Sequence, residues 1–258
     1  YTFNNCQNLY GSLILPENLE YIGLGAFQNC RGFTGSLEIP KRVSVIHQEA
    51  FNYCGFDGIL KLHGGIINIE ENAFRCRFKG ELVLPKNLFV LSNGVFAGCN
   101  FSGELKLPEK LSSIGDFAFG DNQRLTGVLE IPQSVQNIGE GAFIGCSMIE
   151  KLILSDNLES IGSVAFGNCF YINSIVCKSI TPSYMHMNAF DGVEKENVVL
   201  EIPEIAIQQY NSAPGWCEFK KITAHRKLVC RPSELKTLNG RTERQLVLDA
   251  EGKWEVVS

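Results

Sequence analysis

Cysteine is the residue type in this chain with the widest chemical repertoire, and ten cysteines occur in the 258 residues. A thiol could act as a nucleophile, bind zinc or pair in a disulfide. Seven of the ten recur at one position of a repeating pattern: Cys6, Cys30, Cys54, Cys76, Cys99, Cys146 and Cys169. A disulfide needs Cβ atoms about 3.8 Å apart with converging vectors, whereas side chains stacked in one column point in parallel. We therefore predict reduced thiols that are buried as small apolar side chains.

The same column also tolerates other residue types. Asn122 and Val193 occupy it in two repeats, so no partner is lost there. Cys-x-x-Cys pairs are absent, and with them the usual zinc spacing. Cys177 falls at a core position of a predicted strand, whereas Cys217 and Cys230 lie outside the pattern. The sequence leaves open whether these last two cysteines form a disulfide.

The four histidines are placed unfavourably for catalysis. His47 and His186 fall in a glycine column at the edge of a repeat, and His63 replaces a proline that ends a strand. They lie in different repeats, with no Asp or Ser at the spacing of a catalytic triad. His225 and Cys230 are five residues apart in a predicted strand, which places them on opposite faces.

Two Gly-x-Gly runs, at 23–25 and 139–141, lack the third glycine of a dinucleotide-binding loop. Each falls in the ordinary glycine column of the repeat. We therefore predict that the chain is not an enzyme, with no catalytic residue, no metal site and no cofactor.

The repeat that positions these residues is marked by nine phenylalanines in register: Phe3, Phe27, Phe51, Phe74, Phe96, Phe119, Phe143, Phe166 and Phe190. Successive members are 22 to 24 residues apart. Self-similarity at a fixed period in this range is typical of a solenoid, in which each repeat forms one coil stacked on the next.

Each coil is predicted to begin with a short strand, because apolar and polar residues alternate before a proline, as in 37–40. Strands one coil apart must run parallel, and the proline ends the ladder. Two inward columns follow, one running through Val43 and Ile67 and one through Ile46 and Ile69. After Ala-Phe we predict about one helical turn, closed by a left-handed residue. That column reads Asn5, Asn29, Tyr53, Gly98, Asp121, Gly145, Asn168 and Gly192.

The consensus resembles the leucine-rich repeats of the BspA-like (Treponema-type) family of bacterial cell-surface proteins. The segments 37–54, 129–146 and 154–169 carry the resemblance, and 202–222 is similar to that family's terminal coil. The resemblance covers residues 1–222. It implies a right-handed leucine-rich-repeat β-solenoid of about nine 22–25-residue coils. It also implies a cell-surface or secreted adhesion role in an anaerobe of the Bacteroides type, without catalytic residues.

Two regions are expected in the chain. Residues 1–222 form the solenoid, of which 174–222 are degenerate terminal coils, so Phe190 should contribute less to stability than a central phenylalanine. Residues 223–258 form a tail in which 246–257 is predicted to be a capping β-hairpin with its turn at 250–252. The chain starts inside a repeat, without Met, so we expect any export signal or membrane anchor outside this fragment.

The charge pattern argues against nucleic acid as a partner. The chain carries a formal charge of −5. The tail has seven basic and five acidic side chains, which leaves −7 on residues 1–222. Binding to nucleic acid would require a basic stripe.

The candidate binding surface is the outer face of the predicted strands: Ile14, Glu38, Lys61, Val83, Lys106, Glu130 and Ile153, continued by Val176 and Glu201. Glu38 and Lys61, and Lys106 and Glu130, are opposite charges one coil apart. Such pairs contribute about 0.2–1 kcal/mol, so a structural role suffices. The alternative is a face that binds a protein partner, such as a host matrix or another cell-surface protein. A spacer that presents another domain, or a glycan-binding protein, remains a further alternative.

Overall fold

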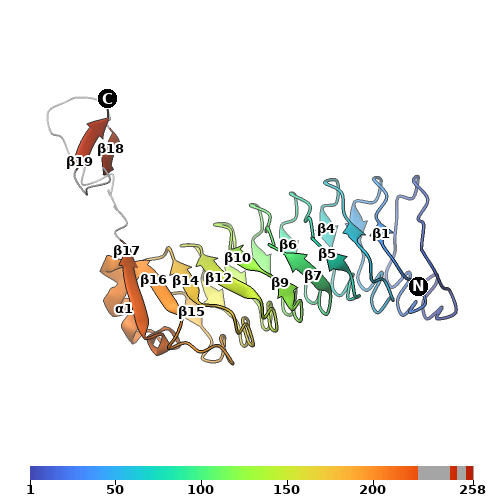
Figure 1. Ribbon diagram of the computed structural model, residues 1–258. Coiled ribbons are helices and arrows are strands. Elements are labelled where there is room, and N and C mark those ends of the chain that lie inside the picture. The colour runs from blue at the N-terminus through green and yellow to red at the C-terminus, as the bar shows by residue number, and fades with distance from the viewer. Residues whose placement is uncertain (226–244, 249–253, 258) are drawn as a thin grey trace. The chain divides into compact units, whose positions relative to one another are not determined.

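The structure is a computed structural model that describes residues 1–225, 245–248 and 254–257. The chain divides into two units, Tyr1–His225 and Arg226–Ser258. The first unit is a stack of coils whose strands all pair in parallel, as Figure 1 shows. About eight turns of chain make up the stack, near the nine that the sequence predicts.

Three series of short strands run along the solenoid. The first lies at the predicted Leu-x-Leu position: β1 (Leu37–Glu38), β3 (Leu60–Lys61), β10 (Gly127–Glu130), β12 (Ile149–Leu154), β14 (Ser174–Cys177), β16 (Val199–Pro203) and β17 (Lys221–His225). The second lies at the Ile column: β2 (Val45–Ile46), β4 (Asn68–Ile69), β6 (Val90–Leu91), β8 (Ser113–Ile114), β11 (Asn137–Ile138), β13 (Ser160–Ile161) and β15 (Tyr184–Met185). The third comprises β5 (Lys79–Gly80), β7 (Asn100–Gly103) and β9 (Arg124–Leu125).

The predicted register of the first series is confirmed wherever these strands pair. Leu37 lies opposite Leu60, and Leu129 lies opposite Leu152. The ladder is interrupted at 82–84 and 105–107, where the described backbone forms no strand and the coils pair through β5, β7 and β9 instead. The leucines of these two segments are still buried. Alternation of side chains therefore fixes which residues face the core, whereas ladder hydrogen bonds can shift along the coil.

The phenylalanine column forms a continuous stack of rings through the core. Consecutive centroids are 5.1 to 5.9 Å apart in eight stacked pairs, from Phe3–Phe27 to Phe166–Phe190. A second buried column lies beside it: Phe33, Phe56, Phe78, Phe101, Leu125, Ile149, Ile172 and Val198. The sequence alone did not reveal this second column, because its distance from the first phenylalanine varies with the length of the link.

The segment after each Ala-Phe is not a helical turn; that prediction was wrong. In residues 1–225 the structure has helical segments only at η1 (Glu204–Ala206), α1 (Ile207–Ser212) and η2 (Trp216–Glu218). Around Phe27 the amides alternate in direction. Ala26 N donates to Gly23 O of its own coil at 3.1 Å, and Phe27 N donates to Ala50 O of the next coil at 2.8 Å. In a helix all of these amides would donate within one coil. Because every second amide donates to the next coil instead, these hydrogen bonds connect the coils.

Left-handed residues produce this alternation. All eight members of the column two residues after Phe have positive φ, as predicted. A second column, two residues before Phe, shares this conformation: Gly25, Glu49, Asn72, Gly94, Phe117, Gly141 and Val164. Gly and Asn adopt positive φ readily. The sequence did not indicate the second column, because Glu, Phe and Val there hide the pattern.

The prediction that Ile67 belongs to an inward column is wrong by one residue. Ile66 is fully buried and Ile67 is 55% exposed, so Ile66 and not Ile67 continues the column of Val43. The spacing of three residues between Val43 and Ile46 recurs between Ile66 and Ile69, and the adjoining isoleucine at 67 obscured it. Ile67 therefore lies on the surface of the solenoid, directly before β4 of the second strand series.

The terminal coil closes the solenoid over the degenerate copy. Tyr210 and Trp216 are buried, and they donate hydrogen bonds to Ser179 O at 3.2 Å and to Ser183 O at 2.9 Å. Phe190 is buried, and its ring centroid lies 5.6 Å from that of Phe219 and 5.1 Å from that of Phe166. We therefore expect Phe190 to contribute about as much to stability as a central phenylalanine, and not less as the sequence predicts.

In the second unit, β18 (Gln245–Leu248) pairs antiparallel with β19 (Trp254–Val257). This pairing agrees with the predicted hairpin at 246–257. The predicted turn at 250–252 and Cys230 lie outside the described residues, so the Cys217–Cys230 pair stays open.

Candidate functional site

The cysteine column serves the backbone of the solenoid. In the part of the chain that the structure describes, none of the cysteines forms a disulfide: Cys6, Cys30, Cys54, Cys76, Cys99, Cys146, Cys169, Cys177 and Cys217. Where the column is buried, each Sγ donates to the carbonyl of the phenylalanine one coil earlier. Examples are Cys54 to Phe27 O at 2.9 Å and Cys146 to Phe119 O at 3.2 Å. The thiol thus adds a second hydrogen bond to a carbonyl that already accepts one from the backbone.

Asn122 shows that a hydrogen-bond donor other than a thiol can occupy the column. Its side chain is fully buried, and its Nδ2 donates to Phe96 O at 2.8 Å and Phe119 O at 2.9 Å. Burial raises the pKa of Cys99 and of Cys169 to about 12. A thiol with so high a pKa has almost no thiolate at neutral pH, so it is a poor nucleophile.

The histidines are held in separate local contacts. His47 Nδ1 lies 3.3 Å from a carboxylate oxygen of Glu70, and its ring packs 4.8 Å from that of Tyr21. His63 Nε2 lies 2.9 Å from Pro40 O, and His186 contacts Asn188. The described residues contain no group of three His, Cys, Asp or Glu side chains that could hold a metal. Nor do they include a helix long and apolar enough to cross a membrane.

The predicted sheet face lies on the surface. Ile14 is 88% exposed and Val83 is 71% exposed, and Glu38, Lys61, Lys106 and Glu130 are also exposed. Ile153 and Val176 are partly buried. From Glu130 onwards these side chains sit on consecutive paired strands, with Glu130 opposite Ile153 and Ile153 opposite Val176.

One of the two predicted charge pairs on this face forms. Lys61 Nζ lies 3.0 Å from Glu38 Oε2. The pair of Lys106 with Glu130 does not form, because Glu130 Oε1 lies 2.8 Å from Lys178 Nζ instead. Lys178 follows β14, two coils away from β10, and sequence alternation does not indicate that its side chain extends back over the face.

A shallow groove of about 390 Å³ crosses the face where the first ladder resumes at β10. Lys106, Val128, Glu130 and Lys178 line it, together with Glu104 and Glu109. Two of the predicted residues, Lys106 and Glu130, thus lie in one depression. Its lining mixes both charges with exposed apolar surface.

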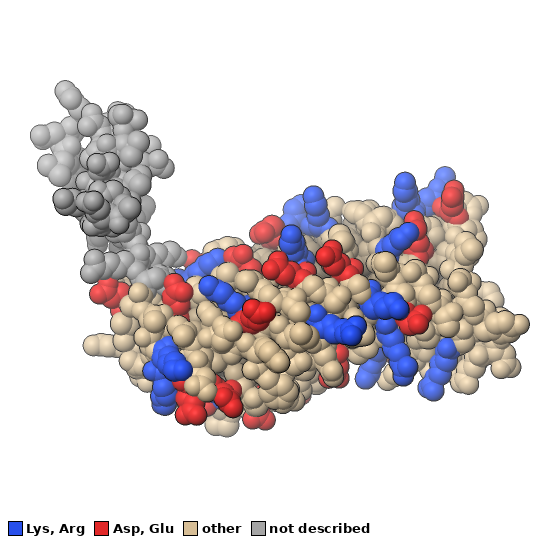
Figure 2. Space-filling view, in the orientation of Figure 1, with Lys and Arg blue, Asp and Glu red and all other residues tan. Residues whose placement is uncertain are grey.

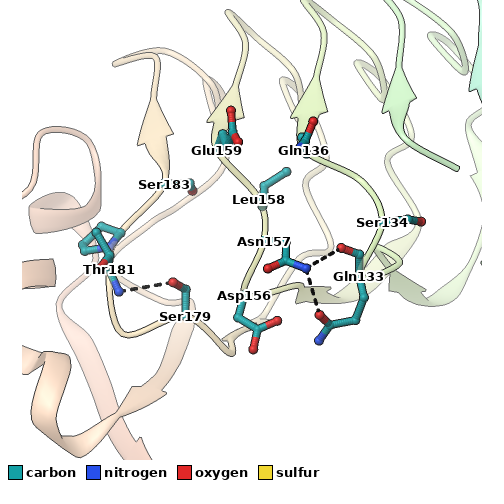
Figure 3. Close-up of a pocket in the computed structure, with 11 residues that line it drawn as sticks. Gln133, Ser134, Gln136, Asp156, Asn157, Leu158, Glu159, Ser179, Thr181 and Ser183 are labelled. Carbon is teal, nitrogen blue, oxygen red and sulfur yellow. Dashed lines mark hydrogen bonds between the residues drawn. The ribbon is translucent and has the colours of Figure 1, made fainter.

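A second depression, of about 660 Å³, lies between the first and second strand series (Figure 3). The loops that link β10 to β11, β12 to β13 and β14 to β15 supply its lining. Asn157 Nδ2 donates to Gln133 O at 3.0 Å, and Thr181 N donates to Ser179 Oγ at 3.2 Å. Its lining consists of amide, hydroxyl and carboxylate side chains with Leu158 and Pro182, and it includes no Lys, Arg, His or Cys.

Parallel short strands, a ring stack along the axis and one buried leucine pair per coil define a leucine-rich-repeat β-solenoid. Proteins of this class commonly bind partners along their extended surfaces. The family model for the BspA type leucine rich repeat region matches residues 1–126 and 123–224, with six copies. The chain therefore belongs to that family.

Two solved structures share similarity with the chain. One is a leucine rich cell surface protein from Faecalibacterium prausnitzii A2-165, with 20% identity, a TM-score of 0.45 and coverage of 79% of this chain. The chain spans 63% of that protein. The other is a leucine-rich repeat protein from Bacteroides ovatus ATCC 8483, with 18% identity, a TM-score of 0.49 and coverage of 84% of this chain and 70% of that one. No curated protein matches the chain.

Proposed function

We propose that this chain is a non-catalytic module of a bacterial cell-surface protein, and that it binds a protein partner through its exposed sheet face. The observation that carries the proposal is the combination of exposed apolar side chains and charges at the same outward position of successive coils. Ile14 and Val83 are largely exposed there. Solenoid proteins commonly bind partners along such extended surfaces, where exposed apolar side chains can enter the contact.

The groove over Lys106 and Glu130 supports a specific contact. Protein interfaces combine an apolar centre with charges that set orientation and association rate. Lys106 has no ion-pair partner among residues 1–225, so it is free to meet an acidic group of a partner. Glu130 and Lys178, which also line the groove, are paired with each other.

A binding screen tests the proposal. The 258-residue chain is assayed against extracellular-matrix proteins and mucin, beside a variant with Lys61→Glu, Lys106→Glu and Glu130→Lys. The matched control carries Lys41→Glu, Lys110→Glu and Glu17→Lys, which change the net charge equally in loops beside the sheet. Binding that is lost only in the sheet variant supports the exposed face.

Two results would contradict the proposal. Binding that survives in the sheet variant would place the contact on another surface. Absence of binding by the unmodified chain would favour a spacer that holds another domain away from the cell. The surface location itself is tested by labelling intact cells with an antibody against the chain.

A further inference from the structure

One coil of the solenoid is a residue short, and the gap opens a notch on its turn edge. The coil reads Phe74-Arg75-Cys76, whereas its neighbours have two residues between Phe and Cys, at 51–54 and 96–99. The missing residue belongs to the left-handed column, between Tyr53 (φ 56°) and Gly98 (φ 69°). Both of these residues line the resulting depression of about 510 Å³.

Three arginines surround this depression: Arg31, Arg75 and Arg77. We name the depression, with Tyr53 and Gly98, the arginine notch. All three arginines are exposed. The guanidinium carbon of Arg75 lies 5.1 Å from the centroid of the Tyr53 ring, a cation–π contact that restricts its position. Gly98 presents no side chain, and no other atom lies where its Cβ would be, which leaves the notch open on that side.

The arginines lack any internal counter-charge. None of the three guanidinium groups makes a hydrogen bond or ion pair within residues 1–225. Among the other basic residues of the solenoid, Arg42, Lys61, Lys178 and Lys195 pair with carboxylates. Three unpaired guanidinium groups around one depression favour an anion from outside, since their planar forks bind sulfate, phosphate or carboxylate in a bidentate manner.

The charge distribution along the solenoid makes this site distinct. Residues 1–80 carry seven basic and seven acidic side chains, whereas residues 81–222 carry nine basic and sixteen acidic ones. Figure 2 shows basic side chains projecting from the lower edge of the N-terminal coils. The N-terminal coils are therefore neutral overall, whereas residues 81–222, with nine basic and sixteen acidic side chains, would repel a long polyanion.

We propose that the arginine notch binds an anionic sugar chain through its sulfate or carboxylate groups. Coils stack about 4.8 Å apart, so Arg31 and Arg75, two coils apart, can contact groups about 10 Å from each other along a chain. A protein partner would need an apolar pocket for an anchoring side chain. The notch offers only the Tyr53 ring, which Arg75 already contacts. Neutral sugars also need a free aromatic face, whereas charged sugars do not.

The test measures binding of the 258-residue chain to three probes by titration calorimetry. They are a heparin octasaccharide, the same octasaccharide after desulfation, and a glutamate peptide of equal charge. Binding of the sulfated probe alone is expected. It should weaken as NaCl rises from about 50 to 200 mM, because exposed ion pairs are screened. Binding of the peptide but not of the octasaccharide would overturn the proposal in favour of an acidic protein segment.

Variants localise the site. Arg31→Glu, Arg75→Glu and Arg77→Glu together should weaken octasaccharide binding by more than about tenfold, since three charge-assisted contacts are lost. The matched control, Lys41→Glu, Lys86→Glu and Lys110→Glu, carries the same charge change on exposed loops and should weaken it by less than about twofold. Equal weakening by both would indicate diffuse attraction and overturn the proposal.

A third variant tests the notch itself. Insertion of Asn between Arg75 and Cys76 restores the length of the neighbouring coils and keeps all three arginines. It should abolish octasaccharide binding while circular dichroism remains unchanged. Full binding by the insertion variant would show that the shortened coil is irrelevant. None of these variants alters the exposed sheet face, so this result and that of the protein-binding screen are independent.

Discussion

Replacing Phe119 by alanine removes one ring from the middle of the stack. Phe119 is fully buried, and its ring lies 5.4 Å from that of Phe96 and 5.5 Å from that of Phe143. Deleting a buried phenylalanine costs about 3–5 kcal/mol, because both the transferred area and the cavity contribute. Two aromatic pairs, each worth about 0.5–1.5 kcal/mol, are part of that loss. We expect Phe119→Ala to lower the free energy of unfolding by about 3–5 kcal/mol.

Two other positions in the column calibrate the expectation. Phe190 is buried with ring contacts on both sides, so Phe190→Ala should cost about as much as Phe119→Ala. Phe3 is 42% exposed and stacks only on Phe27, so its replacement should cost about 1–2 kcal/mol. Phe89, which is 58% exposed, provides a surface control with an expected cost of under about 0.5 kcal/mol.

The assay is equilibrium denaturation in guanidinium chloride, followed by far-ultraviolet circular dichroism. Free energies can be compared only where the slopes with denaturant agree, because repeat arrays can unfold in parts. A cost for Phe119→Ala as small as that of Phe89→Ala would refute the role of the ring stack. A cost for Phe190→Ala as small as that of Phe3→Ala would refute the packing of the terminal coil.

Three further predictions concern the hydrogen bonds of the core. Asn122→Ala should destabilise the solenoid by about 1–3 kcal/mol in the same assay, and Asn122→Cys by less, because a thiol can donate to the same carbonyl; equal costs would contradict this. The free energy of unfolding should fall as the pH rises from the ordinary thiol pKa of 9.0 towards about 12. Over this range the folded chain keeps the Cys99 thiol protonated, whereas the unfolded chain ionises it. The loss for this thiol is about 1.4 kcal/mol per pH unit. The contribution of this thiol should be constant below that range. The free energy of unfolding of Cys99→Ala should therefore fall less between pH 8 and about 10.5 than that of the parent chain, and identical falls would exclude this thiol as a cause. Trp216→Phe should cost about 1 kcal/mol through the lost bond to Ser183 O, and a neutral effect in thermal denaturation would show that this bond does not hold the terminal coil.

The fold could be predicted closely because the repeat states the same physical requirement many times. One phenylalanine, one leucine pair and one left-handed residue recur in each coil, so a chance match at one position does not mislead. The predicted helical turn fails in every coil, and the other predictions fail where single coils differ. Two adjoining isoleucines obscure that Ile66 and not Ile67 faces the core, and alternation relates Lys106 only to the neighbouring coil, whereas Glu130 pairs with Lys178 two coils away.

The candidate site was predictable only in outline. Alternation identifies which strand residues point outward, and Ile14 and Val83 are indeed exposed. It does not indicate depth, because a groove depends on how the backbones of neighbouring coils separate. The groove at Lys106 follows from a break in the first ladder, and the arginine notch follows from one missing residue.

By itself, the sequence determined the solenoid, the parallel register and the buried phenylalanine and cysteine columns, since each depends on local spacing repeated in every coil. Only the tertiary structure decided where amides link coils, which ion pairs form and where the surface is hollow. These features depend on the relative position of residues some 23 or 46 places apart. A small change in coil length moves those residues by several ångströms, which is a large distance for a hydrogen bond and a small one for an apolar core.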